Sequence, residues 1–86
     1  MRIMKLRSDL GTEDVDGELI VLDKTAGKVH QLNSSASFVW NCLSDGLAIE
    51  DIALIISEEC GIEPETALTD VRAVLAQFEA LALVVK

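Results

Sequence analysis

The side chains with catalytic potential in this sequence do not form a recognisable catalytic set. His30 is the single histidine, and Ser34, Ser35 and Ser37 follow it closely. A serine nucleophile with a histidine base also needs a third group to orient the base, and no residue in the sequence is placed for that role. Serines at this point suit the start of a helix, where hydroxyls satisfy free backbone N–H groups.

The carboxylates and thiols give no catalytic or metal-binding pattern either. Glu58 and Glu59 are adjacent, so on a helix they point to different sides and we expect a solvated face. Cys42 and Cys60 lack CxxC spacing and companion histidines, which disfavours a zinc site. The sequence contains no glycine-rich phosphate loop. We therefore expect a protein that is not an enzyme, with no catalytic residues, no metal and no cofactor.

The overall charge disfavours nucleic acid as a partner. The 86 residues carry 7 lysines and arginines against 15 aspartates and glutamates, for a net charge of -8. Proteins bind duplex nucleic acid through cationic side chains that displace counterions. One basic cluster exists, formed by Arg2, Lys5 and Arg7. We interpret residues 1–11 as an extended or flexible arm that solubilises the chain or steers a partner, within one domain spanning residues 1–86.

The compartment follows from targeting signals and cysteine usage. The sequence shows no signal peptide, and its two cysteines lack a disulfide framework, so we expect a cytoplasmic protein with reduced thiols. No apolar run has the length needed to span a bilayer, so we expect no membrane association.

The first third of the chain has the pattern of strands. Residues 18–23 form a short apolar run, and residues 28–32 form a second, alternating run. The link 24–27 contains a glycine, which predicts a hairpin between the two runs. A weaker strand is predicted near residues 12–15, with another extended piece at residues 3–6.

The rest of the chain has the pattern of three helices. Asn33 is a good N-cap, and the first apolar stripe, which ends before Asp45-Gly46, includes Trp40 as a core residue. The second helix is predicted to end at Gly61, and Pro64 suits the first position of the third. The three stripes comprise Ala36, Val39, Trp40 and Leu43; Ile49, Ile52, Ala53 and Ile56; and Leu68, Val71, Leu75, Phe78 and Ala82, the last widened by Ala67, Val74 and Leu81. Residues 83–86 are predicted to be extended and close to the end of the third helix.

The chain from about residue 17 to residue 85 resembles the PqqD family, also called RiPP recognition elements. The resemblance depends on an ordered set of turns, caps and core stripes. That set comprises Gly17-Glu18-Leu19-Ile20-Val21-Leu22-Asp23, Thr25-Ala26-Gly27-Lys28, Leu32-Asn33, Ala36, Val39-Trp40, Asp45-Gly46, Glu50-Asp51-Ile52-Ala53, Gly61-Ile62-Glu63-Pro64-Glu65 and Asp70-Val71.

The sequence departs from the family pattern at four positions. Ala48 stands where a serine or threonine cap usually precedes the second helix, and Ala82 stands where a glycine usually follows the third. Both changes bear on stability. Val29 and His30 replace an aromatic pair often found on the last strand of the sheet, which bears on ligand preference.

The resemblance implies an α+β fold of the winged helix-turn-helix type, with a small three-stranded antiparallel sheet followed by three helices. It also implies a non-catalytic peptide chaperone. Such proteins bind the leader segment of a ribosomally synthesised precursor peptide by β-strand addition. They then present it to a modifying enzyme, which is a radical SAM maturase in PQQ biosynthesis and a leader peptidase with a cyclase, or another maturase, elsewhere.

The resemblance places the peptide beside the last strand of the sheet and against the third helix. An exposed edge strand carries unpaired N–H and C=O groups that such a peptide can complete. The expected peptide-binding residues are Lys28, Val29, His30, Gln31 and Leu32 on the strand, with Arg72, Leu75, Ala76 and Glu79 on the helix.

Two other classes of function stay open from the sequence. A winged-helix DNA-binding regulator is one, although the second helix carries Glu50, Asp51, Glu58 and Glu59 and no basic residue, which opposes docking on phosphates. A structural adaptor subunit without a peptide ligand is the other.

Overall fold

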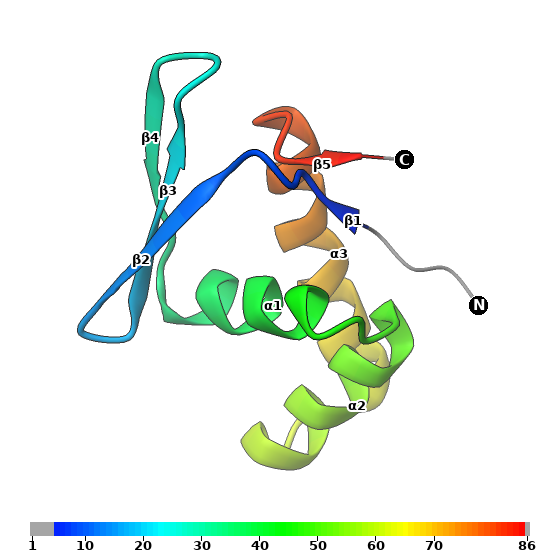
Figure 1. Cartoon of the computed structure of the whole chain (residues 1–86). Helices are drawn as coiled ribbons and strands as arrows, with labels where there is room; N and C mark the ends of the chain where they lie inside the picture. The colour runs from blue at the N-terminus through cyan, green and yellow to red at the C-terminus, as the bar shows by residue number, and fades with distance from the viewer. Residues whose placement is uncertain (1–4, 86) are drawn as a thin grey trace.

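A computed structural model describes residues 5–85 of the chain (Figure 1). Of the sequence-based expectations, Arg2 in the basic cluster, the first half of the extended piece at residues 3–6, and Lys86 lie outside the described residues. The elements are, in order, β1 Lys5–Leu6, β2 Gly11–Val15, β3 Glu18–Asp23, β4 Lys28–Gln31, α1 Ser34–Ser44, α2 Ile49–Cys60, α3 Pro64–Ala80 and β5 Val84–Val85.

Strands β2, β3 and β4 form an antiparallel sheet in that order, so β4 lies at one edge. The link between β2 and β3 is Asp16-Gly17, and both residues have positive φ (54° and 83°), as the tightest hairpin turns require. The Asp14 carboxylate accepts a hydrogen bond from the Gly17 N–H at 2.9 Å. The second hairpin joins β3 to β4 through residues 24–27 and confirms the sequence-based prediction.

One face of this sheet packs on the helices. Along β3, Leu19, Val21 and Asp23 are buried and alternate with half-buried residues. Residues opposite each other in an antiparallel pair share a face, so His30, opposite Val21, and Lys28, opposite Asp23, lie on the helix side.

The junction between β4 and α1 is fixed by hydrogen bonds. The Asn33 side chain accepts from the Ala36 N–H at 2.8 Å and so caps α1 as predicted. Ser37, buried in the first turns of α1, donates to the Leu32 carbonyl at 3.2 Å and accepts from the Leu19 N–H at 2.9 Å. This bridge sets α1 at a defined angle to the sheet.

The ends of α2 and α3 reflect the departures from the family pattern. Ala48, at the N-cap of α2, makes no side-chain capping hydrogen bond. Gly61 ends α2 with φ 64° and Pro64 begins α3, both as predicted. Ala82 follows α3 with φ 58°, a conformation that a glycine would adopt without the steric cost of a Cβ.

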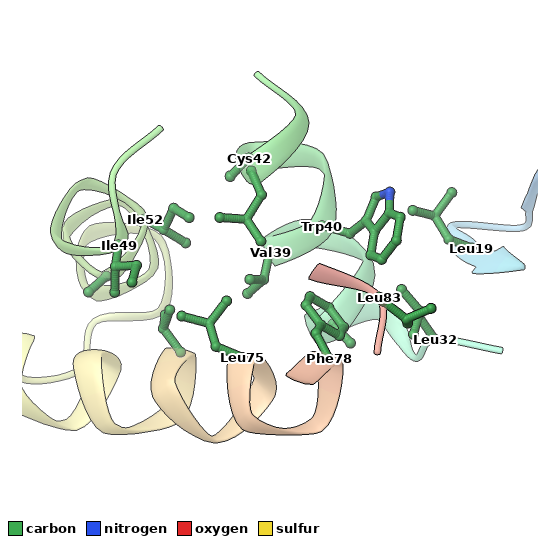
Figure 2. Packing of buried hydrophobic residues seen from close by; sticks show 14 of the residues in the cluster. Leu19, Leu32, Val39, Trp40, Cys42, Ile49, Ile52, Leu75, Phe78 and Leu83 are labelled. Carbon is green, nitrogen blue, oxygen red and sulfur yellow. The ribbon is translucent and has the colours of Figure 1, made fainter. Parts of the chain in front are cut away.

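The core comprises buried residues of all three helices together with Leu19 and Val21 of β3. Trp40 of α1 and Phe78 of α3 pack edge to face, with ring centroids 5.4 Å apart and ring planes at 81° (Figure 2). Trp40 is 4% exposed, which confirms its predicted core role. The other buried hydrophobic residues are Leu19, Val21, Leu32, Ala36, Val39, Cys42, Leu43, Ala48, Ile49, Ile52, Ala53, Ala67, Val71, Leu75 and Leu83.

The two ends of the described chain meet. Lys5 pairs with Val85 and Leu6 with Val84 in an antiparallel β1–β5 pair. Directly after β1, the Arg7 guanidinium donates to Asp23 at 2.8 Å, to Asp9 at 2.6 Å and to the Ala82 carbonyl at 3.0 Å. Within the segment 1–11, which the sequence predicts to be extended or flexible, Lys5–Leu6 is extended and an ion pair with the buried carboxylate of Asp23 on β3 fixes the Arg7 side chain.

The structure has the α+β architecture expected from the sequence, with the three-stranded sheet preceding three helices. Across residues 5–85, no helix combines the length and apolar character that crossing a membrane requires.

Candidate functional site

Strand β4 leaves one edge of the sheet unpaired. Within residues 5–85, β4 pairs with β3 alone, so its other side, which we call the β4 edge (Lys28–Gln31), carries no neighbouring strand. Val29 is 67% exposed, and Lys28 and Gln31 are also exposed. An exposed strand edge offers a row of free backbone donors and acceptors.

The register shows which backbone groups of β4 point outward. The Leu32 N–H donates to the Leu19 carbonyl at 2.8 Å, so Leu32 turns its backbone groups toward β3. Backbone groups alternate in direction along an antiparallel strand, so His30 also faces β3. Val29 and Gln31 consequently present their N–H and C=O groups to the unpaired side.

His30 has an unusual environment on the helix side of this strand. Its Nε2 atom is buried and has no hydrogen-bond partner among residues 5–85. Buried polar atoms are normally paired, so this nitrogen is an exception among the described residues.

A pocket of about 540 Å³ lies between the three helices. The N-terminal half of α1, the C-terminal end of α2 and the middle of α3 enclose it, and we call it the α1–α3 pocket. Only Leu32 and Asn33 separate β4 from the first pocket residue along the chain. The lining residues are Ser34, Ser35, Phe38, Val39, Ile56, Glu59, Cys60, Ile62, Asp70, Val71 and Val74.

The helix residues expected from the sequence lie elsewhere on α3. Leu75 is 3% exposed and points into the core toward α1 (Figure 2). Arg72, Ala76 and Glu79 are exposed, and none of the three lines the α1–α3 pocket. Successive helix residues are about 100° apart, so Arg72 and Asp70 lie on opposite sides of Val71.

The strand residues that the sequence predicts to bind the peptide also include both exposed and buried side chains. Lys28, Val29 and Gln31 are exposed, and His30 is half-buried. Leu32 is 6% exposed and belongs to the core, so its side chain packs under the end of β4 and is not on the surface. The strand side chains on the surface are therefore those of β4 itself.

Sequence reasoning missed most of the pocket residues. Val74 was assigned only to the widened core stripe, yet it is half-buried in the pocket lining. Phe38 is 39% exposed and lies beside, not within, the buried stripe of α1. Phe38 is a large aromatic residue that falls outside the helical spacing of the core residues. It is the one sequence signal that could have indicated a surface pocket here.

Two ionisable groups outside the β4 edge and the α1–α3 pocket, Asp23 on β3 and Cys42 in the core, have shifted pKa values. The hydrogen bond from Arg7, followed by that from the Ala26 N–H at 3.1 Å, lowers the pKa of Asp23 from its usual value. Burial raises the pKa of the Cys42 thiol, which disfavours the reactive thiolate. Among residues 5–85, no three His, Cys, Asp or Glu side chains are grouped so that they could hold a metal ion.

The fold and the exposed edge define a small winged helix-turn-helix-like domain with an open strand beside a helical pocket. The model of the family described as coenzyme PQQ synthesis protein D (PqqD) matches residues 18–84. The chain belongs to the PqqD family, whose members include the RiPP recognition elements.

Two solved structures are similar over nearly the whole chain. One is described as TbiB1 in complex with the TbiA(beta) leader peptide, with 25% identity, a TM-score of 0.88 and coverage of 94% of each chain. The other is lasso peptide synthetase B1 complexed with the leader peptide, with 24% identity, a TM-score of 0.89 and coverage of 99% of this chain and 100% of that one. No curated protein matches the chain.

Proposed function

We propose that this protein binds the leader segment of a ribosomally synthesised precursor peptide by strand addition to the β4 edge and presents it to a modifying enzyme without catalysing a reaction. The observation that carries this proposal is the outward direction of the Val29 and Gln31 backbone groups on an unpaired strand. Membership of the PqqD family, and similar structures that are complexes with leader peptides, support it.

Strand addition explains how such a site would combine affinity for an extended peptide with selectivity for its sequence. Backbone hydrogen bonds to Val29 and Gln31 would form with nearly any extended sequence. Selectivity would come from the side chains of the peptide that contact the exposed side chains of Lys28, Val29 and Gln31. The buried residues Leu32 and Leu75 would hold the strand and the helix in place beneath the peptide.

The partner enzyme is a radical SAM maturase, a leader peptidase or another maturase. One similar structure is described as lasso peptide synthetase B1 complexed with the leader peptide, which supports a partner that acts in peptide maturation. We expect the assembly to act in the cytoplasm. The exposed residues Arg72, Ala76 and Glu79 would then contact either the peptide as it continues across α3 or the enzyme itself.

An NMR titration of the full chain tests the proposal directly. The probes are synthetic peptides covering the N-terminal halves of the short open reading frames beside the gene, with scrambled versions of each as controls. The proposal predicts that one native peptide shifts the amides of Val29 and Gln31 most strongly and that its scrambled version does not. Shifts confined to α2, with β4 unchanged, would contradict the proposed site.

The absence of catalysis needs a separate measurement. We expect the purified protein to leave the bound peptide unchanged in mass, with and without added divalent metal. Addition of the maturase encoded nearby should then produce the modified peptide faster than the maturase alone. A mass change with this protein alone would overturn the non-catalytic assignment.

A further inference from the structure

The α1–α3 pocket combines apolar walls with an acidic lining. Its apolar side chains are Phe38, Val39, Ile56, Ile62, Val71 and Val74. Its ionisable carboxylates are Glu59, from the end of α2, and Asp70, from α3, and both residues are exposed. No lysine, arginine or histidine is among the lining residues.

The pocket lining begins three residues after the β4 edge along the chain. Gln31, the last residue of β4, is followed by Leu32 and Asn33, and then by Ser34 and Ser35 in the pocket lining. An extended peptide advances about 3.3 Å per residue. In a peptide that keeps the direction of β4, a side chain roughly three residues beyond the one that pairs with Gln31 would therefore lie level with Ser34 at the pocket.

We propose that the α1–α3 pocket binds a lysine or arginine side chain of the same leader peptide that pairs with the β4 edge. This inference rests on the proposed function and names the residue type that the site selects. Long basic side chains have an apolar stem and a cationic head, which match the apolar walls and the two carboxylates in turn. Phe38 adds an exposed aromatic ring on which a cation can stack.

Charge complementarity favours this occupant over a purely apolar one. The chain has a net charge of -8, so its overall field attracts a basic segment as well. An acidic leader segment would meet Glu59 and Asp70 with repulsion. The pocket thus indicates a basic leader close to the paired segment.

Selection from a random peptide library displayed on phage tests the preference. The baits are the full chain, the Glu59→Gln/Asp70→Asn double variant, and a Glu58→Gln/Glu65→Gln control. The control removes the same two charges from exposed residues of α2 and α3 that do not line the pocket. We expect the native chain and the control to enrich a lysine or arginine at a fixed distance from an alternating apolar segment, and the pocket variant to lose that enrichment.

Calorimetry with one selected arginine peptide and its citrulline analogue measures the contribution of the contact. Because the carboxylates are exposed, we expect the pocket variant to weaken binding of the arginine peptide by only about three- to tenfold. The citrulline analogue should lose a similar factor on the native chain and nothing further on the variant. The control should stay within about twofold, because distant charges are screened at physiological salt.

The outcomes separate this inference from the proposed function. Peptides that shift the Val29 and Gln31 amides but bind equally well to the pocket variant would overturn the basic-residue pocket and leave strand addition intact. Peptides that bind without any shift along β4 would overturn the proposed function, and the inference with it.

Discussion

Ala82 shows how one backbone conformation can limit stability. Its φ of 58° lies in the region where a Cβ meets the neighbouring carbonyl oxygen. The same residue offers its carbonyl to Arg7, so the strained turn also anchors the contact between α3 and β3. The strain is therefore kept at a point where the helix end and the sheet are joined.

Relief of this strain should stabilise the protein. We expect Ala82→Gly to raise the free energy of unfolding by about 0.5–1 kcal/mol, the difference between the steric cost for alanine and the chain entropy of glycine. Urea titration measures the change. The matched control, Ala80→Gly at the last position of α3, should give no stabilisation, because glycine is a poorer helix residue than alanine.

Trp40 is the residue on which the core depends most. Its ring lies between α1, Phe78 and the sheet (Figure 2), and it is 4% exposed. We expect Trp40→Ala to cost roughly 3–5 kcal/mol, as for other buried large aromatic residues. Leu54→Ala, at a residue that is 50% exposed on α2, should cost far less in the same denaturant series. Similar losses in both variants would show that Trp40 is not central to the core.

Asp23 should make stability depend on acid pH. Arg7 holds the pKa of Asp23 below its usual value in the folded protein, so the ion pair stabilises the fold fully above the unfolded value of about 4. The contribution is lost as the pH falls from there toward the folded pKa. Urea unfolding across this range should show a decline that is smaller in Asp23→Asn, which lacks the titrating group. An equal decline in both proteins would assign acid sensitivity to other carboxylates.

In strand β4, the direction in which each backbone N–H group points matters as much as the identity of the residues. Val29 and Gln31 turn their N–H groups outward, whereas His30 turns its own toward β3. A substitution can therefore remove a donor from the unpaired side without removing one from the sheet.

We expect Gln31→Pro to abolish peptide binding or weaken it at least tenfold, because proline lacks the N–H that an added strand would use. Gln31→Ala keeps the backbone donor and is the matched control, and it should bind almost normally. Circular dichroism checks that both variants stay folded. If Gln31→Pro binds as tightly as Gln31→Ala, the peptide does not pair with this edge.

Local signals in the sequence were enough to predict most elements. Asn33, Gly61 and Pro64 mark helix ends through their own backbone chemistry, and the structure places all three at those ends. The hairpin between β3 and β4 followed from alternation around a glycine-containing link. Each of these signals depends on residues that are close in sequence.

Contacts between distant parts of the chain could not be predicted in this way. The β1–β5 pair joins Lys5 to Val85 through strands too short to show a period. The ion pair between Arg7 and Asp23 also depends on that closure. For the site, periodicity could identify the apolar stripe of α3 but not the pocket, because the pocket depends on how α1, α2 and α3 pack together. Leu75 was predicted both in the apolar stripe of α3 and beside the peptide; its 3% exposure confirms the stripe, and its contact with a peptide stays a prediction.

At the scale of the whole molecule, charge distribution bears on the class of partner. Helix α2 exposes Glu50, Asp51, Glu58 and Glu59 and carries no basic side chain. In a winged helix that binds DNA, a helix must approach phosphates, which an acidic surface repels.

We therefore expect negligible binding to duplex DNA at physiological ionic strength. Fluorescence anisotropy with a mixed-sequence duplex measures this, and lower salt should give only weak, sequence-independent association through the few basic residues. Tight and sequence-selective binding would instead favour a transcriptional regulator over a peptide chaperone.

The meeting of β1 and β5 has a consequence for how this protein can be joined to others. The two ends of the described chain are neighbours in an antiparallel pair, and they lie away from the β4 edge (Figure 1). Termini that lie close together allow a domain to be inserted into a surface loop of another protein, or to be circularly permuted, with little strain. Residues 5–85 therefore have the geometry of an insertable domain. Insertion into a surface loop of a maturase would leave the β4 edge accessible to a peptide.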